Sequence, residues 1–380
     1  MTRRPFRECL VLGTCLVGFA TSCSKEREIP SASSGGSATT TSGGGSGGGE
    51  DVATGGTQTA GNGGELSNPH PTPKYYPVPG FEDCIHVEVK ADCENGWCKL
   101  PPSCVVIGSP EDTWQHGRYT EIQTEVILTH AIEVQQMEMS RAEWKQIASI
   151  FPVGHKQEDD GECLEDGCPI NNVTWWEAVH AANLLSELRG LDPCYEPVNC
   201  EGELGQGLAC EGVAEPERSV YECEGYRLPT WAEAEYAARA GTVSDLYTGN
   251  LTVYDNNNCN FDENLDKAAW YCFNSENRPH VGGEKAANGF GLRDALGNLG
   301  EWVGEVNRAA KAEGGDNPSG KVGVGKDRLI SGGMYNSVAS FCRASNLFFA
   351  AWDVRGGPAG FRLYRTLFDD SERSKAIVSE

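Results

Sequence analysis

The segment Ser331-Gly-Gly-Met-Tyr-Asn-Ser-Val-Ala-Ser-Phe-Cys-Arg-Ala-Ser345, followed by Gly360-Phe-Arg362, carries most of what this sequence says about fold and chemistry. Its glycine pair permits close backbone packing, because glycine adopts conformations that other residues avoid. Cys342 is followed by Arg343, which places a thiol next to a guanidinium in the chain. Whether the protein is an enzyme depends largely on whether Cys342 has a second group beside it that completes a catalytic site.

The start of the chain has the pattern of an export signal. A basic beginning precedes the apolar run Leu10 to Ala20, which is too short to span a membrane as a helix. The run leads into Ala20-Thr-Ser-Cys23, which resembles the processing site of bacterial lipoproteins. We therefore predict a signal peptide at residues 1–23, with Cys23 lipidated as the first mature residue. Ordinary cleavage with loss of Cys23 is the alternative.

The segment that follows is a predicted tether. Residues 24–74 are dominated by Gly, Ser and Thr, a composition that cannot bury a hydrophobic core. We expect one folded domain at residues 75–370 and a short C-terminal tail at 371–380. The tether would hold this domain clear of a membrane in the bacterial cell envelope, facing the periplasm or the cell surface.

The charge balance is strongly acidic. The chain has 55 Asp and Glu residues against 31 Lys and Arg residues, for a formal net charge of −24. Such a surface repels the phosphates of nucleic acids and does not attract anionic lipid headgroups. No nucleic-acid partner is expected, and the simplest role of the acidity is to keep an exported domain soluble.

The cysteines indicate a disulfide-bonded domain. Of the 16, thirteen lie between Cys84 and Cys342. This density in an exported chain favours disulfides over metal sites, and the x4 spacings lack the tight pairs of zinc ligands. The odd number leaves at least one thiol unpaired. Connectivity stays open, with two local pairs as examples: Cys194 with Cys200, and Cys210 with Cys223.

Three helices have recognisable start signals. Each is a hydroxyl residue followed three positions later by Glu, the capping box that satisfies exposed amides at a helix start. The third of these helices is expected to stop at Gly241. Residues 125–128 read as a strand, and no strong helical period follows residue 242. The three capping boxes are Ser140-Arg-Ala-Glu143, Thr174-Trp-Trp-Glu177 and Thr230-Trp-Ala-Glu233.

A family resemblance spans roughly residues 100–367. The sequence resembles the formylglycine-generating enzyme, or sulfatase-modifying factor, domain. This resemblance implies a single irregular α/β (α+β) domain, similar to C-type lectins, with little regular secondary structure. The motifs occur in family order: Ile107-Gly-Ser-Pro-Glu-Asp112, Glu138-Met-Ser140, Ile170-Asn-Asn-Val-Thr-Trp-Trp176, Tyr226-Arg-Leu-Pro-Thr230, Glu235-Tyr-Ala-Ala-Arg239, Gly291-Leu-Arg-Asp-Ala-Leu-Gly-Asn-Leu-Gly-Glu-Trp302, Gly332-Gly333 and Gly360-Phe-Arg362.

The resemblance also implies a structural calcium ion. Four positions match a calcium site of the family: Asp294, Gly297, Leu299 and Glu301. Carboxylate and backbone carbonyl oxygens are the ligands that calcium prefers. Asp294 stands where some members have asparagine. The alternative is that Asp294 and Glu301 only cap or solvate a loop.

The catalytic pattern of the family is incomplete. Its oxidases resemble one another in having two cysteines, five residues apart, that hold copper(I) and convert a cysteine in a C-x-P-x-R peptide to formylglycine. Aligned on the glycine pair, the two positions are Ser337 and Cys342, and Met334 replaces a usual serine. A neutral hydroxyl cannot replace a thiolate for a soft ion, so copper is not expected.

The sequence therefore favours a binding or accessory module over an oxidase. Cys342 as a free nucleophile would need a nearby base or cation, and we expect Arg343 to point to the opposite face of a strand. We predict that Cys342 is a buried structural cysteine or a disulfide partner. The expected ligand is a protein, a peptide or a glycan. The alternative is a formylglycine-generating oxidase with a rearranged site.

Overall fold

The computed structural model describes residues 78–368, except for 114–115, 117–120, 153–162, 215–218, 254, 256, 307–313, 319–324 and 357. The chain divides into two units, Met1–Ser67 and Asn68–Glu380, and every described residue belongs to the second. The predicted signal peptide, tether and C-terminal tail, with Cys23, lie outside the described residues. Among the described helices, none is long and apolar enough to cross a membrane.

Three helices begin at the predicted capping boxes. In each, the hydroxyl side chain accepts the amide of the glutamate three residues later, and the glutamate accepts the amide of the capping residue. The third helix ends at Arg239, where Ala240 and Gly241 both take left-handed conformations, so its predicted end is right to within a turn. The helices are α1 (Arg141–Ile147), α2 (Trp175–Leu188) and α3 (Trp231–Arg239).

A fourth helix was not predicted. It is α4 (Glu263–Ala268), capped by Asp262, whose side chain accepts the amides of Asn264 and Leu265. Six residues are too few to show a helical period. Two 3-10 helices complete the helical elements of the described residues: η1 (Val220–Glu222) and η3 (Ala339–Cys342).

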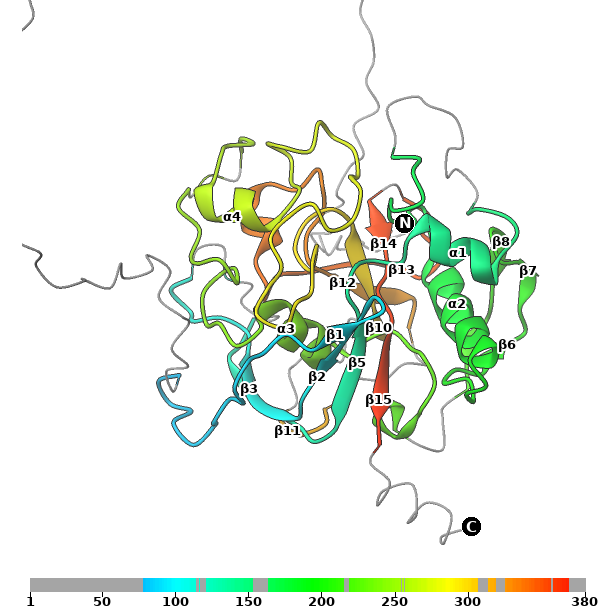
Figure 1. Ribbon diagram of the computed structural model, residues 1–380, viewed down its shortest axis with the longest axis horizontal. Helices are drawn as coiled ribbons and strands as arrows, with labels where there is room; N and C mark the ends of the chain where they lie inside the picture. The colour runs from blue at the N-terminus through cyan, green and yellow to red at the C-terminus, as the bar shows by residue number, and fades with distance from the viewer. Residues whose placement is uncertain are drawn as a thin grey trace, which may run out of the picture. The chain divides into compact units, whose positions relative to one another are not determined.

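The described strands form small sheets that are mostly antiparallel (Figure 1). One four-stranded sheet has the order β1 (Cys93–Glu94), β2 (Trp97–Leu100), β5 (Ala131–Gln135), β15 (Tyr364–Leu367), and a second has the order β13 (Leu347–Ala351), β12 (Asp327–Ser331), β10 (Gly300–Val306), β14 (Ala359–Gly360). A three-stranded sheet contains β11 (Gly315–Asp316), β4 (Thr124–Leu128) and β3 (Ser103–Ile107). Two hairpin-like pairs remain: β6 (Pro197–Val198) with β9 (Gly212–Val213), and β7 (Glu201–Glu203) with β8 (Gln206–Ala209). The predicted strand at residues 125–128 is confirmed as β4.

The second sheet joins three of the sequence motifs. In its register, Glu301 of β10 lies opposite Ser331 of β12 on one side and Gly360 of β14 on the other. The chain leaves β12 directly into the glycine pair. The loop around residues 294–301, the segment 331–345 and the motif 360–362 are therefore neighbours.

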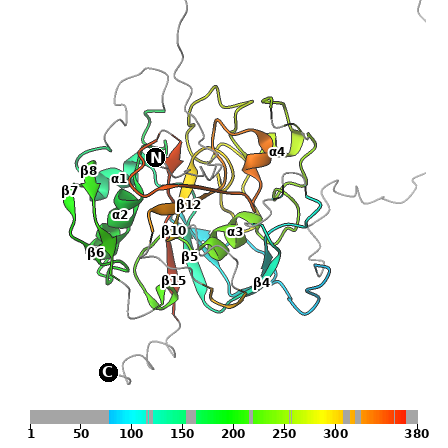
Figure 2. The same cartoon turned by 180° about the vertical axis from the view of Figure 1, so that it is seen from behind.

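The helices cover different regions of this framework. Both views show α1 and α2 side by side, with the β7–β8 pair next to them (Figures 1 and 2). The buried apolar residues of α2 share one core with Trp302 and Phe361. The short helix α4 and η3 share an apolar cluster, to which Leu265 of α4 and Cys342 of η3 both belong.

Six disulfides connect twelve of the thirteen cysteines between Cys84 and Cys342, and Cys342 is free and buried. The two local pairs suggested from sequence are wrong. Residues 197–213 form a nested hairpin, in which the pair of β6 and β9 encloses the pair of β7 and β8. This nesting brings Cys194 to Cys223 and Cys200 to Cys210. The disulfides are Cys84–Cys104, Cys93–Cys98, Cys163–Cys168, Cys194–Cys223, Cys200–Cys210 and Cys259–Cys272.

Candidate functional site

The glycine pair lets the chain pass close to Cys342. Gly332 and Gly333 have φ values of +92° and +77°, a region that strains other residues. A Cβ atom at Gly333 would lie 2.7 Å from the sulfur of Cys342 and 2.9 Å from the carbonyl oxygen of Phe341. The close backbone packing expected of these glycines is therefore confirmed.

Ser337 and Cys342 both form hydrogen bonds with the backbone of Met334. The amide of Met334 donates to the Ser337 hydroxyl (3.1 Å), and the amide of Ser337 donates to the Met334 carbonyl (2.9 Å). Burial raises the pKa of Cys342 to about 12, and a hydrogen bond from the Met334 backbone only partly opposes this rise. The thiol thus stays protonated at physiological pH.

Met334 also fills space at the start of β10. A Cβ atom at Gly300 would lie 3.0 Å from Cε of Met334 and 2.7 Å from a methyl carbon of Ile330. Met334, which replaces a usual serine of the family, therefore packs in the space left by the absence of a side chain at Gly300.

The expectation that Cys342 and Arg343 lie on a strand is wrong. Residues 332–338 are non-helical and non-strand, and Ala339–Cys342 forms η3. Arg343 nevertheless turns away from the thiol. Its guanidinium makes two bonds to the Glu121 carboxylate, of 2.5 and 2.8 Å.

Glu121 is a buried acceptor that sequence reasoning missed. Its carboxylate also accepts the hydroxyls of Ser109 (2.6 Å) and Ser345 (2.9 Å). Burial raises the pKa of Glu121, but Arg343 and the two hydroxyls outweigh burial, so the net pKa is lowered. Glu121 follows no capping or ligand pattern in the sequence, so only the fold reveals this pairing.

A cleft of about 550 Å³ opens beside this ion pair. Two of its lining residues, Asp112 and Asp245, are acidic, and Arg239 is engaged by Glu235 and two backbone carbonyls. Ser345 contributes from the segment that carries Cys342. The cleft is therefore polar and acidic.

The predicted calcium residues form a buried, charged loop. Oδ2 of Asp294 accepts the amide of Gly283 (2.6 Å), whereas Oδ1 is buried and has no hydrogen-bond partner among the described residues. Glu301 is held by the guanidinium of Arg362, with a shortest distance of 2.8 Å. Gly297 takes a left-handed conformation, and its amide donates to the carbonyl of Gly332. The loop is thus fixed against the glycine pair.

A third carboxylate, Glu138, lies in the same region. It accepts the amide of Leu299 and the side-chain amide of Asn298, both at 2.7 Å. Burial raises the pKa of Glu138 well above its usual range, and the charges of Asp294 and Glu301 raise it further. Burial likewise raises the pKa of Asp294. Glu138 belongs to one of the family motifs, but the sequence alone indicates no role for it.

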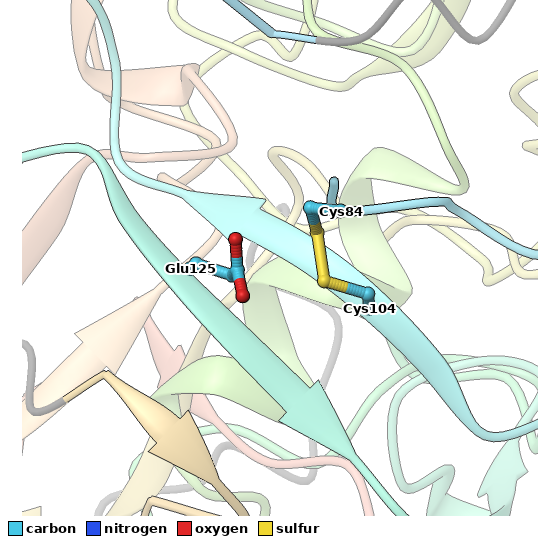
Figure 3. A group of neighbouring side chains, drawn as sticks. All are labelled: Cys84, Cys104 and Glu125. Carbon is cyan, nitrogen blue, oxygen red and sulfur yellow. A yellow bond between two sulfur atoms is a disulfide. The ribbon is translucent and has the colours of Figure 1, made fainter. Parts of the chain in front are cut away.

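These three carboxylates do not converge on a single point. In the part of the chain that the structure describes, one group of three Cys, His, Asp or Glu ligand atoms lies within 4.8 Å, and it is Cys84, Cys104 and Glu125. Figure 3 shows the two sulfurs of this group joined in a disulfide beside Glu125. Because metals bind thiolates, the oxidised pair is not a metal site.

The sequence profile described as the sulfatase-modifying factor enzyme 1-like domain matches residues 111–367. The chain belongs to this family. The resemblance inferred from the motifs is thereby confirmed.

Solved structures confirm the mixed α+β fold of this sulfatase-modifying-factor domain. Treponema denticola variable protein 1 has a TM-score of 0.56 at 22% identity, covering 71% of this chain and 95% of that one. PvdO from Pseudomonas aeruginosa has a TM-score of 0.54 at 19% identity, covering 74% of this chain and 99% of that one. At these identities the likeness concerns the fold alone.

A curated relative shares part of the sequence. It is the chaperone protein LppX of Paenibacillus barcinonensis, which is 28% identical over 185 residues. The match covers 44% of this chain and spans about 60% of the relative's length.

Proposed function

We propose that this chain is an exported, membrane-tethered lipoprotein whose sulfatase-modifying-factor domain is a binding or accessory module and not an oxidase. The state of the Ser337 and Cys342 pair carries this proposal. Copper(I) at this site would need two thiolates. Here one position is a hydroxyl that accepts a backbone amide, and the other is a buried thiol with a pKa near 12. Neither group is prepared for metal binding or nucleophilic attack.

The decisive experiment is aerobic incubation of the purified domain with copper(I) and a peptide containing C-x-P-x-R. Mass spectrometry of the peptide reports any conversion of its cysteine to the aldehyde. We expect none. Clear aldehyde formation by the wild-type domain would overturn the proposal in favour of the oxidase.

A Ser337→Cys variant tests what the missing thiol means. Restored turnover would show that the remainder of the site is intact and that one substitution separates this domain from an oxidase. Ser340→Cys is the matched control, because it adds a thiol at another buried serine of the same segment. Turnover in both variants would point to nonspecific copper chemistry.

The acidic cleft is the binding site that we propose for the ligand. Its volume of about 550 Å³ lies in the range of small-ligand sites, and its Asp112 and Asp245 carboxylates favour a basic or hydroxyl-rich group. We propose that a protein, peptide or glycan is bound there. A screen of peptide and glycan arrays should give ligands that Asp112→Lys loses and Glu94→Lys, a control at another exposed acid, retains. Equal binding by both variants would place the ligand elsewhere.

Calcium is the cofactor that we propose for the Asp294 loop. The support is the unpartnered Oδ1 of Asp294, together with the burial of Asp294, Glu301 and Glu138, of which Glu301 is paired with the guanidinium of Arg362. Asp294 and Glu301 would supply carboxylate oxygens, and Gly297 and Leu299 their carbonyls. The ion would compensate charge in the loop, with no role in chemistry.

The six disulfides support an oxidising compartment outside the cytoplasm. We propose that Cys23 carries the lipid that anchors the chain to the membrane. Metabolic labelling with a radioactive fatty acid should mark the wild type but not Cys23→Ala. Cys15→Ala, a change within the signal sequence, should keep the label. Labelling of the Cys23→Ala chain would disprove this anchor.

A further inference from the structure

Arg328 is a buried cation without a counter-charge among the described residues. It belongs to β12, and its exposed fraction is 0%. All three of its guanidinium nitrogens are buried, and no described residue forms a hydrogen bond with them. Since a buried charge without partners is strongly unfavourable, this arrangement calls for a group that completes it.

The other fully buried arginines of the described residues are arranged differently. Arg227 binds Glu233 at 2.7 Å, Arg343 binds Glu121 at 2.5 Å, and Arg362 binds Glu301 at 2.8 Å. Each of the three therefore has a carboxylate partner. The chain has 55 acidic residues, so a scarcity of carboxylates does not explain why Arg328 is without one among the described residues.

Aromatic rings lie against the Arg328 guanidinium. Its central carbon lies 4.1 Å from the ring centre of Trp175 and 5.3 Å from that of Trp352. Such stacking attracts the cation but uses none of its N–H donors. Burial lowers the pKa of Arg328 to about 10, so the group keeps its charge at neutral pH.

A further unpartnered donor lies in the same cluster. The ring of Trp176 is 4.9 Å from those of both Trp175 and Trp352, and its Nε1 atom is buried without a hydrogen-bond partner. The two adjacent tryptophans are also the first residues of α2, where the helix dipole is positive. Glu177 in that turn is already bound by Arg355, at 2.7 Å. The Arg328 guanidinium, Nε1 of Trp176 and the positive end of the α2 dipole therefore lie in one cluster, and no described residue accepts a hydrogen bond from these two side chains.

We propose that Arg328 and Trp176 form a binding site for a small oxyanion, a carboxylate or a phosphate. Two coplanar oxygens would accept from the edge of the guanidinium, the geometry for which arginine is suited. Trp352, whose ring contacts the guanidinium, is half-buried. This site does not depend on the proposed binding function.

Thermal unfolding in phosphate, with chloride at equal ionic strength as reference, tests the site. Ligands that bind only the folded state raise Tm by mass action. Above saturation, each tenfold increase in phosphate should raise Tm by roughly 2–4 °C. Formate in a second series distinguishes a carboxylate from a phosphate preference. The proposal would be overturned if neither anion raised Tm beyond the chloride reference.

Variants assign the effect to the guanidinium. Arg328→Met should abolish the anion-dependent shift. Arg365→Met is the matched control, because Arg365 also stacks on an aromatic ring, that of Tyr226, but already has a carboxylate partner in Glu133. If Arg328→Met does not fold, Arg328→Lys retains the charge without the planar fork and should weaken phosphate binding about tenfold. An unchanged shift in either Arg328 variant would contradict the assignment.

Discussion

The sulfur of Cys342 lies so close to Gly333 that a single added carbon at that glycine would approach it to 2.7 Å. This contact explains why the thiol is inaccessible, because the backbone of the glycine pair lies directly on it. It also links the most recognisable motif of the sequence to the one free cysteine of the described residues.

We predict that Gly333→Ala lowers the free energy of unfolding by about 3 kcal/mol or more. The new Cβ atom would meet both the thiol and the backbone of η3, and the left-handed φ of +77° adds strain. Denaturant unfolding monitored by tryptophan fluorescence measures the loss.

Gly207→Ala is the control for this substitution. Gly207 has nearly the same φ, +78°, but no atom lies within 4 Å of its added Cβ. It should therefore lose only about 1 kcal/mol from backbone strain. Equal losses in the two variants would show that the contact with Cys342 is unimportant.

The second prediction concerns the reactivity of Cys342. Its pKa of about 12, against an ordinary value of 9.0, leaves far less thiolate at pH 8. Iodoacetamide should therefore alkylate the folded protein roughly 1,000-fold more slowly than the urea-unfolded chain. Mass spectrometry over a time course gives both rates, and comparable rates would disprove the burial of the thiol.

The same pKa difference predicts how Cys342 affects stability with pH. The unfolded chain releases this proton near pH 9.0 and the folded chain only near pH 12. The contribution of the protonated thiol is therefore full below pH 9.0 and is lost as pH rises towards 12. Cys342→Ala should show a shallower decline of unfolding free energy in this range, and an identical decline would contradict the prediction.

A third prediction concerns the buried pair of Glu121 and Arg343. Glu121→Gln removes the charge that compensates a guanidinium with an exposed side-chain fraction of 1%. We expect a loss of about 3–5 kcal/mol in unfolding free energy. Glu133→Gln, whose partner Arg365 is partly exposed, should lose less than about 1 kcal/mol. Similar losses in both would show that burial does not govern the difference.

A fourth prediction tests calcium. If the ion binds at the Asp294 loop, excess calcium at about 100 times its Kd adds roughly 2.7 kcal/mol to the free energy of unfolding, and EGTA reverses this gain. Asp294→Ala should remove the calcium dependence, whatever its effect on stability without calcium. The exposed Asp316 gives the control, Asp316→Ala, which should keep it. Calcium dependence that survives Asp294→Ala would place the ion elsewhere.

Local structure could be read from the sequence where the chemistry is local. Each capping box acts within four residues, so Ser140, Thr174 and Thr230 revealed their helix starts directly. The family resemblance was also readable, because its motifs recur in order along the chain. The odd number of cysteines predicted a free thiol, although it did not say which one.

Contacts between distant segments could not be read in this way. The disulfides of residues 194–223 follow from the nesting of two strand pairs, so the sequentially adjacent pairing was wrong. The pairing of Arg343 with Glu121 spans 222 positions, and nothing in the local sequence marks it.

By itself, the sequence determined the family, the helix starts and the replacement of one thiol by Ser337. Only the tertiary structure decided that Cys342 is the free thiol of the described residues and that it is buried under Gly333. It also showed that Arg328 has no carboxylate partner within the described part of the chain, unlike the other fully buried arginines there. The physical reason is that burial raises a pKa, or leaves a charge without a partner, through atoms brought together by the fold and not by the order of residues.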